Sequence, residues 1–464
     1  MTDEQEPASP QGPGGNKPAF DPSAGHQVRP KLRRVRGFPL QAKNAEGEPV
    51  QMLGLADAQQ ISQRMVATLP AVQHLLPMLD GSRDLDAIVT GVGRGLTRGF
   101  LEDLVAQLDD AGLLEGPTFD AMHAEVKVQF DESDVLPPGS SAQVAEALVV
   151  QEVGQEATAE QKAEMGPAKL RGALDTWIEQ ALAKAEDPAL DALPAVIVAP
   201  HIDYPRGWMN YAAIYGRLRT VERPDRIVIL GTNHFGFSTG VCGCDKGFET
   251  PLGVSPLDRD LLEAIQARLG PEDAAKLLEH RFDHEREHSV ELQLPWIQHC
   301  LGPTEPEGGH VPVFAALVHD PTVNGGDAYD GQGLGLEPFM DALRAALEDV
   351  GGRTLIVSSA DLSHVGPAFG DQKPLAGDEP EAKAARQRVS QIDQEMLALV
   401  TGNKPDDLLA SMAWQQNPTR WCSVGNLVCA MKVAEPEEVR LLNYAGAMDQ
   451  QGLSLVSHAA LAMS

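Results

Sequence analysis

Three apolar runs in the sequence are each followed within a few residues by a histidine. The runs and the polar residues after them are 196–199 with His201 and Asp203, 226–230 with Asn233 and His234, and 353–359 with Asp361 and His364. The carboxyl ends of parallel strands in an α/β sheet meet at one edge, where ligands bind. These side chains are therefore predicted to share one pocket.

A further segment, HEREHSVELQLPW at 284–296, could reach this pocket. Its apolar pattern predicts a helix that ends or bends at Pro295. His288 and Glu291 are three residues apart, so both can lie on one side of that helix. His284 is interpreted as a surface residue of the same helix.

The segment RWCSVGNLVCAM at 420–431 adds a thiol. Cys422 is expected at a helix start, where the helix dipole favours the thiolate, whereas Cys429 is expected to be a buried small hydrophobe. Two imidazoles, from His201 and His234, and the Cys422 thiolate suit a transition metal such as Zn(II), Fe(II) or Cu, with coordination sites left open.

The remaining polar groups of the predicted pocket would then assist the ion. Asp203, Asp361 and His364 are expected to fix imidazole tautomers or to move protons. Two other clusters are not assigned a function. Cys242-Gly243-Cys244 lacks the second cysteine pair of a metal site. GVGRG at 91–95 lacks the strand that precedes a dinucleotide-binding loop, so it is interpreted as an ordinary loop.

The elements that must position these residues follow from the pattern after Leu193. Short β-branched runs, including a fourth at 311–318, alternate with helical patterns at 257–269 and 339–347. This alternation predicts an α/β domain over 191–464, with a central, mostly parallel sheet covered by helices.

The first 190 residues have a different composition. Residues 1–27 are rich in Pro and Gly and are predicted to be a disordered tail. A small domain is expected over 28–116, followed by an acidic bridge over 117–190 that contains a helix near 170–184. Within the small domain, the pattern predicts a strand at 50–55, a helix carrying Ile61, Met65 and Leu69, helical spacing at 85–89, an apolar stripe at 100–108, and a helix end at Gly112.

The ordered motifs APHIDY, ILGTNH, HSVELQLPW, VSSADLSHVG and a late single cysteine resemble the Memo family, including protein B of the AmmeMemoRadiSam system, over about 190–460. That family is similar to class III extradiol dioxygenases. The resemblance implies metal binding by His201, His234 and Cys422, with Asp361 and His364 lining the site and the His288 motif nearby. The family usually has Pro-His-Ala-Gly-Tyr, Pro-Ser-His-His and Cys-Gly. The departures from these motifs are Ile202, Asp203, Asn233, Phe235 and Ser423.

The pattern LDGSRDLDAIV followed by LVAQLDDAGLL resembles the winged-helix fold of the PqqD-like family, whose members hold a peptide for a partner enzyme. A small helical domain without that role is the alternative. Together, the two resemblances imply a small-molecule or peptide substrate and a radical SAM protein as a partner.

Composition limits the functions that remain. The net charge of −30 disfavours nucleic-acid binding, and the sequence has no long apolar run for a membrane span. Five sparse cysteines and an acidic start predict reduced thiols and a cytoplasmic location. The leading hypothesis is an iron- or copper-dependent, dioxygenase-like oxidoreductase. The alternatives are a non-catalytic peptide or protein interaction module and, less favoured, a zinc-dependent hydrolase.

Overall fold

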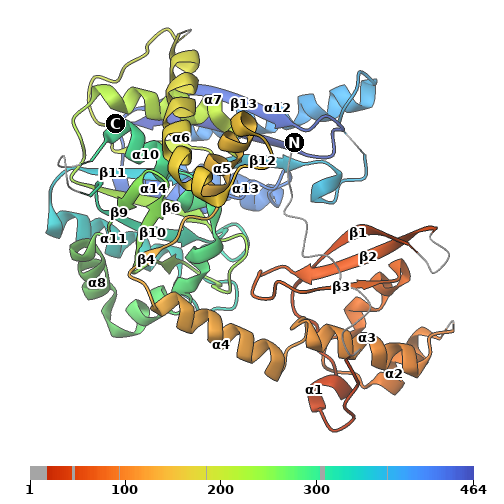
Figure 1. Ribbon diagram of the computed structural model, residues 1–464. Helices are drawn as coiled ribbons and strands as arrows, with labels where there is room; N and C mark the ends of the chain where they lie inside the picture. The colour runs from red at the N-terminus through yellow and green to blue at the C-terminus, as the bar shows by residue number, and fades with distance from the viewer. Residues whose placement is uncertain (1–17, 44–47, 94, 184, 304–308, 374) are drawn as a thin grey trace. The chain divides into compact units, whose positions relative to one another are not determined.

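The computed structural model describes residues 18–43, 48–93, 95–183, 185–303, 309–373 and 375–464 (Figure 1). The chain forms two compact units that divide between Glu132 and Ser133. The stretch expected to be a bridge is therefore shared between the two units. It contains three helices, α4 (Pro117–Asp131) in the first unit and α5 (Ser140–Val153) and α6 (Ala159–Leu182) in the second.

The first unit combines a small antiparallel sheet with helices. The sheet has the order β1-β2-β3, and the elements before α4 are α1 (Gly25–Val28), β1 (Val35–Lys43), β2 (Pro49–Asp57), β3 (Met65–Thr68), two 3₁₀ turns (Pro70–His74 and Leu76–Met78), α2 (Leu85–Val92) and α3 (Arg98–Asp110). Asp84 and Thr97 cap α2 and α3 with their side chains. Gly112 follows α3 at φ +67°, as the expected helix end requires. The winged-helix and PqqD-like assignment of 28–116 stays a prediction.

Two expectations for this unit are wrong. The segment expected as a helix at 61–69 contains β3, whose alternating burial and pairing with β2 bury Val66 and Thr68. The predicted disordered tail includes ordered residues, because Phe20 packs against the core and the buried Gln27 donates to Asp109 (2.6 Å). Residues 1–17 lie outside the described residues, as does Arg94 of the GVGRG run.

The second unit is built on an eight-stranded mixed sheet. Its order is β12-β14-β5-β11-β6-β10-β7, and β13 pairs with β14. The four predicted strands form the parallel centre: β5 (Val196–Ala199), β11 (Thr354–Ser359), β6 (Arg226–Thr232) and β10 (Val313–Val318). The antiparallel strands are β7 (Cys242–Gly243), β12 (Asp361–Val365), β13 (Val439–Met448) and β14 (Leu455–Met463). The expected α/β fold is confirmed, with a sheet that is parallel only at its centre.

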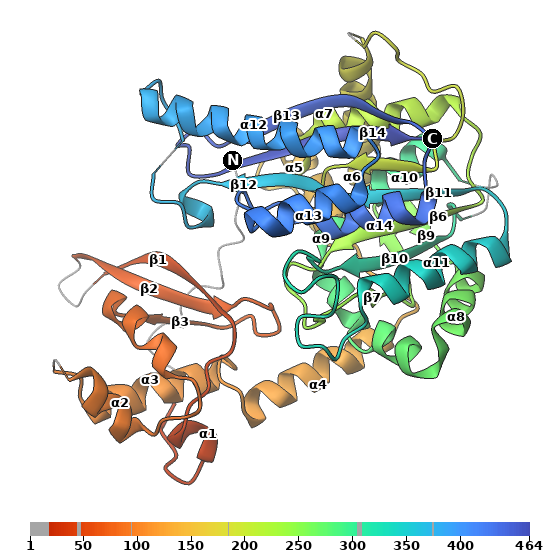
Figure 2. The ribbon, with the colours of Figure 1, turned by 180° about the vertical axis from the view of Figure 1, so that it is seen from behind.

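Helices cover both faces of this sheet (Figures 1 and 2). One layer contains α6, α7 (Tyr204–Tyr215) and α10 (Leu294–Leu301), joined by stacking of Trp296 on Trp177 and Tyr211. The other layer contains α8 (Arg259–Leu278, broken at Gly270), α11 (Leu336–Val350), α12 (Pro380–Thr401), α13 (Pro405–Gln415) and α14 (Val424–Ala434). Because the central strands are buried on both faces, their sequences are nearly continuous apolar runs.

Short elements complete the second unit. They are β4 (Val135–Leu136), β8 (Gly247–Thr250) and β9 (Gly253–Ser255) in a separate small sheet, α9 (His288–Glu291), and 3₁₀ turns at Gly216–Thr220, Arg281–Arg286 and Pro367–Phe369. None of the helices in the described ranges has the length and apolarity needed to span a bilayer.

Candidate metal centre

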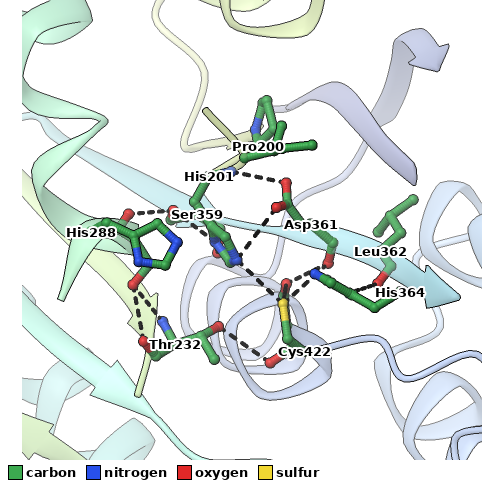
Figure 3. A network of polar contacts seen from close by, with 12 residues as sticks. Pro200, His201, Thr232, His288, Ser359, Asp361, Leu362, His364 and Cys422 are labelled. Atoms are coloured by element: carbon green, nitrogen blue, oxygen red, sulfur yellow. Dashed lines mark hydrogen bonds and ion pairs between the residues drawn. The ribbon is translucent and has the colours of Figure 1, made fainter. Parts of the chain in front are cut away.

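The predicted histidines meet at the carboxyl ends of three neighbouring strands. β5 leads to His201, β6 leads to His234, and β11 lies between β5 and β6 in the sheet. Cys422 approaches from the segment just before α14. Figure 3 shows Cys422 facing His201, with Asp361 and His364 beside them.

The ligand atoms of His201, His234 and Cys422 all lie within 4.8 Å of one another. The Cys422 Sγ atom is 3.3 Å from His201 Nε2. Two ligands on one tetrahedral ion, with metal–nitrogen and metal–sulfur bonds of about 2.0 and 2.3 Å, are about 3.5 Å apart. The donor set and its spacing therefore fit a single metal ion.

The backbone fixes the tautomer of His201. Its Nδ1–H donates to the carbonyl oxygen of Ser359 (3.1 Å), which leaves the lone pair on Nε2, toward Cys422. Burial lowers the pKa of His201 to about 3, so the ring is neutral at pH 7, as a metal ligand must be.

Glu287 performs the same task for the other imidazoles, and the sequence did not single it out. Its carboxylate accepts from the Nδ1–H (3.0 Å) and backbone N–H (2.8 Å) of His234 and lies 3.2 Å from Nδ1 of His288. Although burial opposes it, these imidazoles hold the pKa of Glu287 well below its usual range. Both rings therefore keep Nε2 available for a ligand. The available signal was a carboxylate directly before His288.

The structure corrects the reading of 284–296. A 3₁₀ turn, the four-residue α9 and then α10 replace the expected single helix, and Pro295 lies in the first turn of α10. His288 does join the cluster, stacked on His234 with ring centroids 4.9 Å apart. Glu291 faces elsewhere, since it accepts from Gly139, Ser140 and Ser141 at the start of α5.

Asp361 and His364 are brought to the site by an irregularity in β12. The register of β12 against β14 shifts between these two residues, and such a bulge redirects side chains. Asp361 accepts the backbone N–H of His201 (3.0 Å), and its carboxylate lies 3.7 Å from Nε2 of that ring. His364 Nδ1–H donates to the carbonyls of Leu362 (2.9 Å) and Arg420 (3.1 Å), so its Nε2 can accept a proton.

Backbone and side-chain contacts hold Cys422 in place. Its carbonyl accepts from Thr232 Oγ1 (3.2 Å), and Thr232 in turn accepts from the buried Asn426 (3.0 Å). Burial, followed by the charge of Asp361, raises the pKa of the Cys422 thiol to about 12. In the metal-free chain, burial thus opposes the thiolate that the helix start was expected to favour.

Other sequence-predicted residues have structural contacts. Asp203 caps α7, accepting from the Arg206 backbone N–H (3.1 Å) and pairing with its guanidinium. His284, expected at the surface, is 3% exposed, and its Nε2–H donates to the Cys242 carbonyl (3.0 Å). Cys242 and Cys244 are buried, and Cys429 is buried as expected.

The fold and the cluster describe an α/β protein with a histidine- and cysteine-rich site at the strand ends. A sequence model of the family described as "Memo-like protein" matches residues 157–462. The chain belongs to the Memo-like protein family.

Curated relatives agree with this assignment. A MEMO1 family protein of Desulfurococcus amylolyticus is 25% identical over 304 residues, covering 64% of this chain and 93% of the relative. One from Thermotoga maritima is 25% identical over 296 residues, covering 63% and 85%. One from Methanopyrus kandleri is 25% identical over 294 residues, covering 62% and 89%. The similarity thus spans nearly the whole length of these relatives and leaves the N-terminal unit outside the family match.

Proposed function

We propose that the second unit is a mononuclear, metal-dependent oxidoreductase that acts on a small or peptide substrate. The observation that carries the proposal is the convergence of His201 Nε2, a His234 nitrogen and Cys422 Sγ within 4.8 Å. Imidazole and thiolate together suit iron or copper, and zinc is the alternative.

The ion would be held by His201, His234 and Cys422, with His288 as a further nitrogen beside them. When bound, iron or copper would supply Lewis acidity and a change of oxidation state. Asp361 orients His201 through its backbone N–H, and Glu287 orients His234 and His288.

His364 is proposed to move the proton. Burial lowers the pKa of His364, so the ring is neutral at pH 7. Its Nδ1–H is committed to backbone carbonyls, so the ring accepts a proton at Nε2. Asp361, whose pKa is held low by His201 and the neighbouring imidazoles despite burial, stabilises the imidazolium that forms.

The test is metal analysis of protein purified without oxygen, with oxygen uptake measured in the presence of candidate substrates. His201→Ala, His234→Ala and Cys422→Ala should each lose the metal. His299→Ala is a matched control, because His299 pairs with Asp175 in α6, away from the cluster. A full metal load in the three site variants would refute the site.

The same experiment separates the alternatives. Zinc with no oxygen uptake would favour hydrolysis, and partner binding that survives Cys422→Ala would favour an interaction module. We further propose that the N-terminal unit, as a PqqD-like domain, presents a peptide, and that a radical SAM protein is a partner. A pull-down that captures neither a peptide nor a radical SAM protein would contradict that part.

A further inference from the structure

A cavity of about 620 Å³ opens beside Cys422. Its lining comes from two segments. The loop after β10 contributes Asp320 and Val323, and the stretch from α13 to α14 contributes Gln416, Asn417, Arg420 and Cys422. Cavities of this size hold small-molecule ligands. Cys422, the proposed sulfur ligand, forms part of its wall, so the cavity adjoins one side of the proposed metal centre.

The part of the wall next to Cys422 has an unusual backbone. Gln416, Asn417 and Arg420 have φ values of 58°, 45° and 58°, the left-handed region that costs energy for residues other than glycine. Asn417 secures the turn by donating to the carbonyl of Trp421 (2.8 Å) and accepting its N–H (2.7 Å). The segment therefore holds an energetically costly backbone shape where it forms the cavity wall.

The two charged residues of the wall differ in their partners. The guanidinium of Arg420 pairs with Asp371, and its Nε–H donates to the His364 carbonyl (2.8 Å). Asp320 accepts only neutral donors among the described contacts, the Thr322 backbone N–H (2.9 Å) and the Asn417 amide (3.4 Å). The cation is thus neutralised within the protein, whereas the anion is left without a cationic partner in the described residues.

We infer that this cavity is the substrate chamber of the proposed metal centre and that Asp320 selects substrates bearing an ammonium or guanidinium group. The inference rests on the proposed function, because it takes the metal held by Cys422 as the place where the substrate reacts. The cationic group would complete the ion pair that Asp320 lacks. An anionic substrate would be repelled by Asp320. It would not form a compensating ion pair with Arg420, because Arg420 is already paired with Asp371.

The test uses the full chain freed of metal with a chelator, so it does not depend on metal binding. The reagents are two methanethiosulfonates of similar size, one cationic (trimethylammonium-ethyl) and one anionic (sulfonatoethyl), and a smaller neutral one (methyl). Each is reacted separately with Cys422. Rates are read by mass spectrometry of the Cys422 peptide, with Cys300 in α10 as the internal reference.

Other acids near Cys422 also favour cationic reagents. The decisive quantity is therefore how far the ratio of cationic to anionic rates changes when Asp320 is substituted. Asp320→Asn should lower the ratio of cationic to anionic rates at Cys422 by roughly tenfold. Asp341→Asn, which removes an equal charge from an exposed position on α11, should leave the ratio unchanged. Val323→Trp should slow even the neutral reagent, because it narrows the chamber.

Protection of the unmutated protein supplies an independent test. Millimolar agmatine should protect Cys422 from the neutral reagent, whereas glutarate should not. A lysine tripeptide tested beside agmatine distinguishes a peptide side chain from a free amine as the source of the cation. An unchanged ratio in Asp320→Asn with the neutral rate preserved, or no protection by either cation, would overturn the inference. Loss of metal in the site variants tests the metal centre separately.

Discussion

Glu287→Gln is the sharpest test of how the site is organised. Glu287 is 3% exposed and accepts with one oxygen from His234 Nδ1–H and the Ser289 N–H, and with the other from the His234 backbone N–H. Glutamine keeps the shape but replaces one acceptor oxygen with an NH₂ donor. The new NH₂ group then faces one of the N–H groups that Glu287 accepts from, so two buried donors meet. This lowers the free energy of unfolding by about 1–3 kcal/mol.

The effect on metal affinity follows from the tautomer. If the new NH₂ faces His234 Nδ1, that nitrogen must accept, and the ring proton moves to Nε2, the proposed ligand atom. Loss of such an orienting carboxylate weakens metal binding by about 10- to 100-fold.

The assay is competition for zinc against a chromophoric chelator, at fixed pH, together with urea unfolding. Glu291→Gln, four residues away, is the matched control. Its carboxylate holds the start of α5 and not the histidines, so it should lower stability and leave zinc affinity unchanged. Wild-type zinc affinity in Glu287→Gln would refute the tautomer argument.

Three further outcomes are expected. Metal-free protein should lose stability as pH falls below about 6.5, because the unfolded chain binds a proton there that buried His201, with a pKa of about 3, does not bind in the folded state. The loss is about 1.4 kcal/mol per pH unit for each histidine that stays neutral when folded. A urea midpoint that does not change between pH 7 and 5 would contradict this. Gly425→Ala should lower thermal stability and zinc affinity together, since its Cβ would collide with the His319 carbonyl beside the Cys422 turn. Asp393→Asn should cost about 1–3 kcal/mol in urea unfolding, because this buried carboxylate accepts from Trp421 Nε1 (2.8 Å) and three hydroxyls; unchanged stability would refute that role.

The parts of the fold that follow local rules were predictable. β5, β6, β10 and β11 are short apolar runs, and the strand-end rule placed His201 and His234 together. Cys422 was added from its expected place at a helix start, and the family resemblance supported it, although it is 221 residues from His201 in the chain.

The errors arose where long-range contacts decide the structure. Helical spacing paired His288 with Glu291, but the backbone before His288 is a 3₁₀ turn followed by an extended residue, so Glu287 faces the histidines instead. The antiparallel strands β12 and β14 pair across about 90 residues of chain, and no local pattern encodes that register. Likewise, β3 is a strand because β2 pairs with it.

The raised pKa of Cys422 leads to a last prediction, that metal binding releases the thiol proton. The thiol, with a pKa of about 12, holds its proton at pH 7 in metal-free protein, whereas His201 is already neutral. A metal must displace that one proton, so zinc affinity should rise about tenfold per pH unit between pH 6 and 8. In Cys422→Ser, whose hydroxyl is a far poorer ligand, residual binding should lose this slope. A pH-independent affinity in the unmutated protein would mean that the sulfur is not a ligand. His288 is a second candidate source of a released proton, because Glu287 raises its pKa in spite of burial. Measuring the slope in His288→Gln as well assigns the proton to the thiol or to that imidazole.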